Sequence, residues 1–234
     1  TAGSFIMGVH DGHRERLRAR FAEHGLESFN ELNALELLLC YAIPRRDTNE
    51  LAHRLLDAFG SLSGVFQASM QELTSIPGIG ENAAALILMV PQIVKKAHVS
   101  KAKKTKIIRN STDAGNYLLP YFLDEQDEIV MMLCLDNKRA VICCREMGRG
   151  VVNCVDANIR RMVETALKVK TTTVIIAHNH PNGVALPSRE DDNFTRALYR
   201  SLGLLGITLE DHIIVANDEF VSLADSGVMH LFKY

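Results

Sequence analysis

Two histidines, a serine and an aspartate lie close together in the stretch HNHPNGVALPSRED, residues 178–191. His178 and His180 end a β-branched run, TTTVIIAHNH, which is typical of a strand buried in a sheet. Because side chains alternate along a strand, both imidazoles point to one face and Asn179 points to the other. Pro181 then ends the strand, so the pair is expected at the rim of the sheet, where two neutral imidazoles suit one zinc ion.

Ser188 and Asp191 have the spacing of a helix cap, in which a serine precedes an acidic residue in the first turn. Capping alone accounts for both residues. It does not compete with metal binding, because a capping serine faces the strand end and Asp191, one turn into the helix, can reach the same space. Two histidines and one carboxylate would leave the fourth position of a tetrahedral zinc ion for water.

The elements expected around these residues alternate between strands and helices. Helices are predicted in the segments STDAGNYLLPYFL, DANIRRMVETALKVK and SREDDNFTRALYRSLGLLG. Strands are predicted in EIVMMLCLD, RAVICCREM, TTTVIIAHNH, ITLEDHIIVAN and EFVSLAD. This alternation indicates a layered α/β domain, assigned to residues 111–234.

The first part of the chain, residues 8–98, has only helical patterns and is predicted to be a small all-α domain. Its first helix is expected to follow a cap at Asp11 and to end at Gly25. In the segment LTSIPGIGENAAALILMV, the glycines Gly78 and Gly80 allow a tight turn and expose backbone N–H groups at a helix N-terminus, where a phosphate can bind. Glu81 follows where a basic residue would favour DNA, so a hairpin used only for packing is the alternative.

Positive charge is concentrated between Lys95 and Arg109, which hold seven Lys and Arg residues and no acidic one. Residues 99–110 are interpreted as a basic linker, since such blocks are usually solvated; contact with nucleic acid is the alternative. Weak, non-specific DNA binding would use the residues Gly78, Gly80, Lys95, Lys96, Lys101, Lys103, Lys104 and Lys106.

The composition is that of an ordinary globular protein, with 234 residues, 47% apolar and 23% charged. No apolar run is long enough to span a bilayer, so no membrane segment is expected. The five cysteines are odd in number and lack CxxC spacing, which favours free thiols in a reducing cytoplasm over disulfides or a zinc ribbon. The sequence does not indicate an oligomeric state.

The spacing His-x-His, seven residues, Ser, two residues, Asp resembles the JAMM (MPN+) metalloprotease motif. The wording AHNHPNG…PSRED…T resembles that of the bacterial RadC family, and IPGIG followed by alanines resembles a helix-hairpin-helix motif. This resemblance implies a cytidine-deaminase-like α/β fold with Zn²⁺ on His178, His180 and Asp191. It also implies a catalytic glutamate on an upstream strand. Glu128, fifty residues before His178, fits best, while Glu125 and Glu164 are the alternatives.

The implied reaction is hydrolysis of a peptide or isopeptide bond in an unidentified protein or peptide. Zinc lowers the pKa of bound water. Glu128 would accept the water proton and pass it to the leaving amine, and Ser188 would hydrogen-bond the oxyanion. Asn182, the apolar residues 184–186 and Arg161 depart from residues common in the family. The first two changes would make the substrate rim more apolar.

Other functions were considered from the same residues. The main alternative is a DNA-associated accessory protein, in which the zinc domain is only a structural or binding module. An HNH nuclease is excluded because its residues are spread over a ββα unit. A nucleoside deaminase is excluded because H-x-E and P-C-x-x-C are absent. His212 is interpreted as a strand histidine satisfied by its neighbours, and a position near the site is the alternative.

Overall fold

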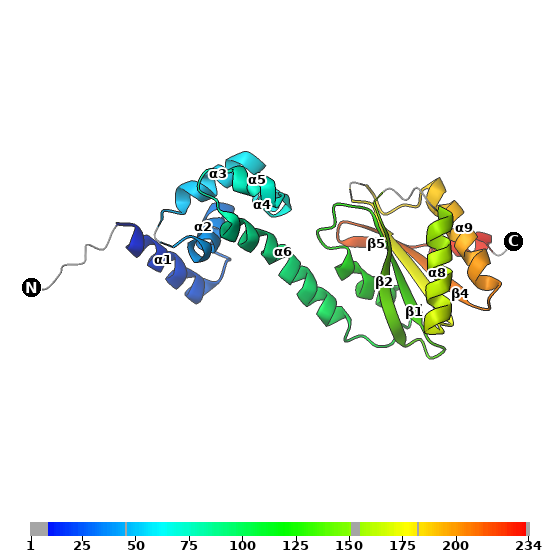
Figure 1. Ribbon diagram of the computed structural model, residues 1–234. Helices are drawn as coiled ribbons and strands as arrows, with labels where there is room; N and C mark the ends of the chain where they lie inside the picture. The colour runs from blue at the N-terminus through cyan, green and yellow to red at the C-terminus, as the bar shows by residue number, and fades with distance from the viewer. Residues whose placement is uncertain (1–8, 45, 151–154, 182, 233–234) are drawn as a thin grey trace, which may run out of the picture. The chain divides into compact units, whose positions relative to one another are not determined.

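The computed structural model describes residues 9–44, 46–150, 155–181 and 183–232. The chain divides into two compact units, Thr1–Val94 and Lys95–Tyr234. The first unit is helical and the second contains a five-stranded sheet (Figure 1). The predicted fold class, an all-α region followed by an α/β domain, is therefore confirmed, while the exact boundaries 8–98, 99–110 and 111–234 stay predictions.

Helices build the first unit, and some of them begin at a side-chain cap. They are α1 (Val9–His24), α2 (Glu31–Ala42), α3 (Asn49–Phe59), α4 (Leu62–Gln67), α5 (Met70–Ser75) and the start of α6 (Glu81–Ala102). Side chains of Asn30, Ser61 and Ser69 accept the backbone N–H groups that open α2, α4 and α5. The prediction of a cap at Asp11 is wrong, because α1 already begins at Val9. The expected end is correct, and Gly25 has a φ of +63°.

The turn before α6 requires glycine. Gly78 has a φ of +97°, and a Cβ atom built there would lie 2.6 Å from Cδ2 of Leu51. Any other side chain would therefore be strained by this φ, and its Cβ atom would require Leu51 to shift. Helix α6 continues through Pro91 to Ala102, so the basic segment begins as helix. Farther along, Ile107 pairs with Ala140 and thus attaches the segment to the second unit.

The sheet of the second unit has the strand order β2-β1-β3-β4-β5. Its strands are β1 (Ile129–Leu135), β2 (Val141–Arg149), β3 (Thr173–Asn179), β4 (Thr208–Ala216) and β5 (Glu219–Ser222). Strands β3 and β4 are parallel, and the other neighbours are antiparallel. Strands β1 and β3 lie inside the sheet, which explains why almost every residue in them is buried.

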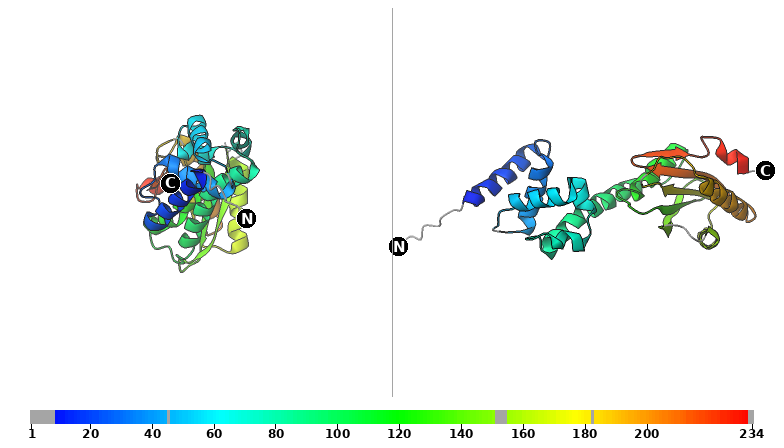
Figure 2. Two further views of the ribbon diagram at one scale, coloured as in Figure 1. Left: turned by 90° about the vertical axis from the view of Figure 1, so that its left-hand side faces the viewer. Right: turned by 90° about the horizontal axis from the view of Figure 1, so that it is seen from above.

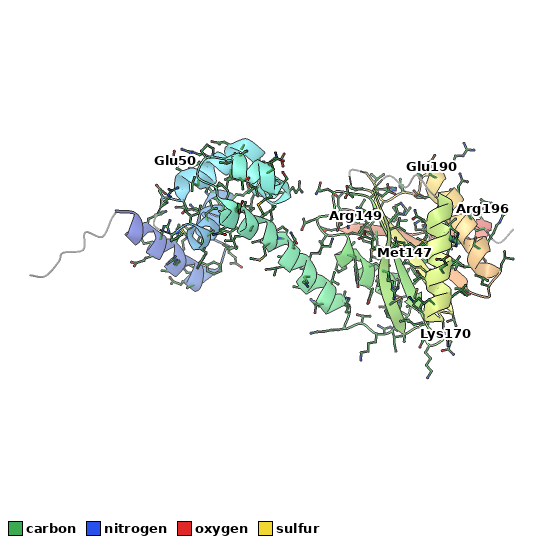
Figure 3. The ribbon with its side chains drawn as sticks, in the orientation of Figure 1. Glu50, Met147, Arg149, Lys170, Glu190 and Arg196 are labelled. Atoms are coloured by element: carbon green, nitrogen blue, oxygen red, sulfur yellow. The ribbon has the colours of Figure 1, made fainter. Side chains whose placement is uncertain are left out.

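Helices cover both faces of this sheet (Figures 1 and 2). On one face, α8 (Val155–Val169) and α9 (Arg189–Gly203) pack through Met162 and Leu198. Met147 of β2, labelled in Figure 3, belongs to the same core. On the other face, α7 (Ser111–Leu118), followed by the 3₁₀ turn Leu119–Tyr121, packs through Tyr117 and Leu118. A second 3₁₀ turn, Val228–Phe232, completes the α8/α9 side.

The composition gave two expectations, one for the cysteines and one for membrane-spanning segments. The four cysteines within the described ranges, Cys40, Cys134, Cys143 and Cys144, are free thiols, as expected. Cys154 lies outside the described residues. Within the part of the chain that the structure describes, no helix combines the length and apolar character needed to cross a membrane.

Candidate metal centre

His178, His180 and Asp191 come together at the end of β3. Each offers a ligand atom, and these atoms all lie within 4.8 Å of one another. The Nε2 atoms of the two histidines are 2.9 Å apart. Asp191 brings Oδ1 to 3.1 Å from Nε2 of His178 and Oδ2 to 3.5 Å from Nε2 of His180. His178 is buried and the other two are partly buried, so the group lies at the rim of the sheet.

The helix cap predicted at Ser188 is present and holds Asp191 in place. Ser188 Oγ accepts the N–H of Asp191 at 3.1 Å and donates to its Oδ2 at 2.7 Å. The backbone N–H of Ser188 also donates to Oδ2, at 2.8 Å. This reciprocal capping box opens α9 and aims the remaining carboxylate oxygen, Oδ1, at His178. Capping and placement of a candidate ligand are thus achieved by the same contacts.

The electrostatics of the centre favour an ionised carboxylate at Asp191. Burial alone would raise the pKa of Asp191, but hydrogen bonding and charge interaction with His178, with further bonds from Ser188, hold this pKa well below its usual range. Behind the centre, burial lowers the pKa of His212 well below its ordinary value, and repulsion by His178 adds to the effect. His212 is therefore neutral at physiological pH.

His212 lies beside the centre, which is the alternative that the sequence left open. It is satisfied by neighbours, as expected of a strand histidine, but one neighbour is the candidate ligand His178, whose Nδ1 lies 2.7 Å from Nε2 of His212. The other is Thr195 of α9, whose Oγ1 lies 2.6 Å from Nδ1 of His212. The pairing of β4 with β3, which sets His178 beside Ile214, explains the contact. Only the phrase LEDHIIVAN, a polar pair inside an apolar strand, signalled it.

Glu128 lies one residue before β1, half-buried, on the strand that pairs with β3. Val130 is paired with His178, so strand alternation carries Glu128 toward the face that bears His178. The side chain of Asn179 holds the backbone on either side of it. Asn179 Oδ1 accepts from Ile129 N at 2.8 Å, and Nδ2 donates to the carbonyl oxygen of Asp127 at 3.0 Å.

The alternative glutamates are engaged elsewhere. Glu125 forms ion pairs with Lys95 and Arg149, and these pairs keep its pKa low although burial opposes them. Arg149 is labelled in Figure 3. Glu164 pairs with Arg160 on the exposed side of α8. Among the described residues, no ion pair or side-chain hydrogen bond involves the carboxylate of Glu128, which leaves it the freest of the three.

The rim of the centre is apolar on one side. Val184 and Leu186 are 66% and 61% exposed, which is unusual for large apolar side chains between a strand and a helix. The carbonyl oxygen of Val184 lies 3.0 Å from Nδ1 of His180 and so ties this rim to a candidate ligand. Asn182 lies outside the described residues. Arg161 donates to the carbonyl oxygen of Met147 at 3.2 Å.

The residues proposed for DNA binding lie in both units. Gly78 and Gly80 line a hollow with Arg46, a basic residue that the sequence interpretation did not include. Lys95 is engaged with Glu125, whereas the remaining lysines of the set are exposed; these are Lys96, Lys101, Lys103, Lys104 and Lys106. Their use in binding stays a prediction.

Comparisons with known proteins agree with this fold. Residues 108–228 match the RadC-like JAB domain family, which defines the class of the second unit. Residues 12–85 match the UPF0758 N-terminal family. A UPF0758 protein of Bacillus licheniformis is 35% identical over 215 residues, covering 92% of this chain and 96% of its own. One of Fusobacterium nucleatum is 31% identical over 225 residues, covering 93% and 97%.

The chain therefore belongs to the UPF0758 family and carries a RadC-like JAB domain, a metalloprotease-like domain in which His178, His180 and Asp191 form a candidate metal site. The resemblance to RadC inferred from the motif is confirmed.

Proposed function

We propose that this protein is a zinc-dependent hydrolase that cleaves a peptide or isopeptide bond. The observation that carries the proposal is the convergence of two imidazole nitrogens and one carboxylate within 4.8 Å at the end of β3. In a metal-free protein, three such atoms turned toward one point repel each other's lone pairs unless a proton or a cation lies between them. A cation-binding role explains why they are held together.

The donor set fits zinc. Imidazole nitrogen favours zinc and related transition metals, whereas magnesium and calcium favour sites made of oxygen atoms only. Three protein ligands with one open position are typical of catalytic zinc, while structural zinc sites usually have four protein ligands. A zinc ion bound here would supply Lewis-acid activation of a water molecule and a carbonyl group.

The chain's own residues would supply the rest of the chemistry. Glu128 would accept the proton of the attacking water and deliver it to the leaving amine, since its carboxylate forms no ion pair with another residue of the described ranges. Ser188 already donates its proton to Asp191, so stabilising an oxyanion would require the hydroxyl to turn toward the substrate. Val184 and Leu186 would contact an apolar side chain next to the scissile bond.

Metal analysis of the purified protein tests the proposal. We expect about one zinc per chain, as a single site with three protein ligands requires, and loss of that zinc in a His178→Ala/His180→Ala variant. The matched control is His53→Ala/His98→Ala, which changes two exposed histidines elsewhere. Equal zinc content in both double variants, or none in the wild type, would overturn the assignment.

A specific observation favours a second candidate, a DNA-associated accessory role for the helical unit. The hollow at the N-terminus of α6 is lined by the exposed residues Gly78, Gly80 and Arg46, and also by Glu81, whose charge opposes that of Arg46. Glycines at a helix N-terminus can offer backbone N–H groups beside the guanidinium group. Such a combination suits a phosphate of a nucleic-acid backbone. We propose weak, sequence-independent binding, to which the exposed lysines of the basic segment would add charge.

A further inference from the structure

We infer that the end of the sheet opposite the candidate metal centre is a docking surface for an anionic lipid bilayer. The surface, which we call the basic end, consists of residues 136–140, 167–172 and 200–208. These are the turn between β1 and β2, the end of α8 with the residues after it, and the end of α9 with the turn that leads into β4. The basic end shares no residue with the metal site.

Backbone hydrogen bonds bring the three segments of the basic end together. The N–H of Thr172 donates to the carbonyl oxygen of Leu135 at 3.1 Å, so the end of α8 lies beside the end of β1. The N–H of Thr208 donates to the carbonyl oxygen of Thr172 at 3.0 Å, which places the turn after α9 at the same point. In Figure 3, Lys170 lies at the opposite end of the helix layer from Glu190, which begins α9 beside the metal centre.

Positive charge dominates the basic end. Its segments hold one acidic residue and five basic residues, namely Lys138, Arg139, Lys168, Lys170 and Arg200. The acidic residue, Asp136, is engaged, because its Oδ1 accepts the backbone N–H groups of Lys138 and Ala140, each at 2.8 Å. Arg139 pairs with Glu210 of β4 at 2.7 Å. The other four basic residues are exposed and form no ion pair with another described residue, so their charge is available to a partner.

Three leucines are exposed at the same end. Leu204 is 89% exposed, Leu167 is 51% exposed and Leu205 is 45% exposed. Leu204 and Leu205 lie in a turn closed by the bond from the N–H of Ile207 to the carbonyl oxygen of Leu202, at 3.0 Å, so ordered backbone presents them to solvent. Single exposed leucines are common, but several at one end of a domain are typical of an interaction site.

A bilayer surface matches this combination of groups better than a nucleic acid does. Anionic head groups attract lysine and arginine side chains, and the acyl chains beneath them accept leucine side chains. A nucleic-acid backbone offers phosphates to the basic residues but no apolar surface to Leu204 and Leu205. Strand β3 leads from the basic end to the metal centre over seven residues, so the centre would lie up to roughly 20 Å from the bilayer and outside the contact.

Sedimentation of the full chain with lipid vesicles tests the inference. We expect binding to mixed phosphatidylglycerol and phosphatidylcholine vesicles, weakened by salt, and far weaker binding to phosphatidylcholine alone. Lys168→Gln/Lys170→Gln should lower the affinity about 25-fold, since each lysine near an anionic surface contributes about fivefold. Leu204→Gln/Leu205→Gln should lower it at least about tenfold, because these side chains would no longer enter the acyl region. Lys168→Arg/Lys170→Arg keeps the charge and should bind as the wild type does.

Matched controls make the same chemical changes elsewhere. Arg16→Gln/Lys96→Gln removes two exposed positive charges from α1 and α6, and Met89→Gln/Ile93→Gln removes two exposed apolar side chains from α6. We expect both controls to bind the anionic vesicles as the wild type does. Circular dichroism checks that each variant is folded, and none of these changes should alter the zinc content.

Four outcomes are decisive. Absence of wild-type binding to anionic vesicles, or equal losses in the controls, overturns the inference. A loss in the lysine variant without a loss in the leucine variant also overturns it, because insertion into a bilayer requires both kinds of side chain. If the wild type ignores vesicles and the lysine variant loses affinity for duplex DNA, the basic end binds nucleic acid instead. A wild type that binds vesicles as expected but binds no zinc contradicts the proposed function alone.

Discussion

Replacing Ser188 by alanine separates the two roles of the capping box that opens α9. The change removes the acceptor for the N–H of Asp191 and the donor to its Oδ2, at 3.1 and 2.7 Å. The bond from the backbone N–H of Ser188 to Oδ2, at 2.8 Å, does not need the hydroxyl and can remain. Asp191 therefore loses part of its support but keeps its ligand atoms.

The magnitudes follow from these contacts. Loss of an N-cap serine typically costs about 1 kcal/mol, within a range of about 0.5–2 kcal/mol, and we expect the free energy of unfolding of the second unit to fall by that amount. Looser positioning of Asp191 should lower zinc affinity by at most about tenfold, which corresponds to about 1.4 kcal/mol. Asp191→Ala removes a ligand and should exceed the loss of about 100-fold that an outer partner can cause.

Ser69→Ala provides a closely matched control in the first unit. Ser69 and Glu72 form the same box at the start of α5, with Ser69 Oγ accepting at 3.2 Å and donating at 2.7 Å, and the backbone N–H of Ser69 donating at 2.8 Å. Hydrogen exchange of peptides from each unit reports the local loss of stability. Competition with a chelator reports zinc affinity.

Three outcomes are distinguishable. If Ser188→Ala destabilises the second unit and leaves most of the zinc affinity, capping is its main role. If Ser188→Ala loses as much zinc as Asp191→Ala, the serine determines whether Asp191 can bind at all. A loss of zinc affinity in Ser69→Ala equal to that in Ser188→Ala refutes the reasoning, because Ser69 does not hold a candidate ligand.

Three further predictions concern other residues. Glu128→Gln should retain zinc and fold but lose hydrolysis, because an amide cannot accept the water proton; persistent turnover of a peptide substrate by the variant would exclude this role. Burial raises the pKa of Asp211 to about 6, so the folded protein binds more protons than the unfolded one between about pH 4 and 6, and the free energy of unfolding should fall by about 3 kcal/mol as the pH rises through this window. Asp211→Asn should remove that fall in urea titrations, and an unchanged fall would exclude Asp211 as its source. The dependence of duplex-DNA affinity on salt concentration should become flatter by about three to four units of slope when four lysines are replaced by Gln, namely Lys101, Lys103, Lys104 and Lys106. A bulky residue at Gly80 should instead weaken binding with little change in this slope. An unaltered slope in the lysine variant would show that the contacts lie elsewhere.

Local sequence patterns were sufficient to predict most helices and strands and the grouping of the candidate ligands. His178 and His180 are two residues apart, and Asp191 follows in the next helix, so strand alternation and a capping pattern bring them together without knowledge of the fold. The tight turn at Gly78 was likewise predictable, because a glycine between two helical patterns allows the positive φ found there.

Contacts between distant strands could not be read in this way. His212 lies 34 residues after His178, and their contact depends on the parallel register of β3 and β4, which an apolar strand pattern does not specify. Thr195 lies on a helix where a threonine has no distinguishing sequence signal. The cap expected at Asp11 failed for a different reason, because helix boundaries are set by tertiary context as well as by local capping residues.

The side chain of Asn179 disfavours an incorrect register between β1 and β3 during folding. Strand β1 is apolar on both faces, so sliding it by one residue along β3 would still bury apolar side chains, and hydrophobic patterning penalises such a slip only weakly. A slip would, however, break the two hydrogen bonds that the buried amide of Asn179 makes with the backbone of Ile129 and Asp127. Each polar group left without a partner would cost about 1–3 kcal/mol. The slip would also place a neighbouring residue at the position that Glu128 now occupies relative to β3. Asn179, which lies between the two histidines, therefore favours the correct register of β1 and β3. In this register Glu128 lies next to the end of β1 on the side of His178.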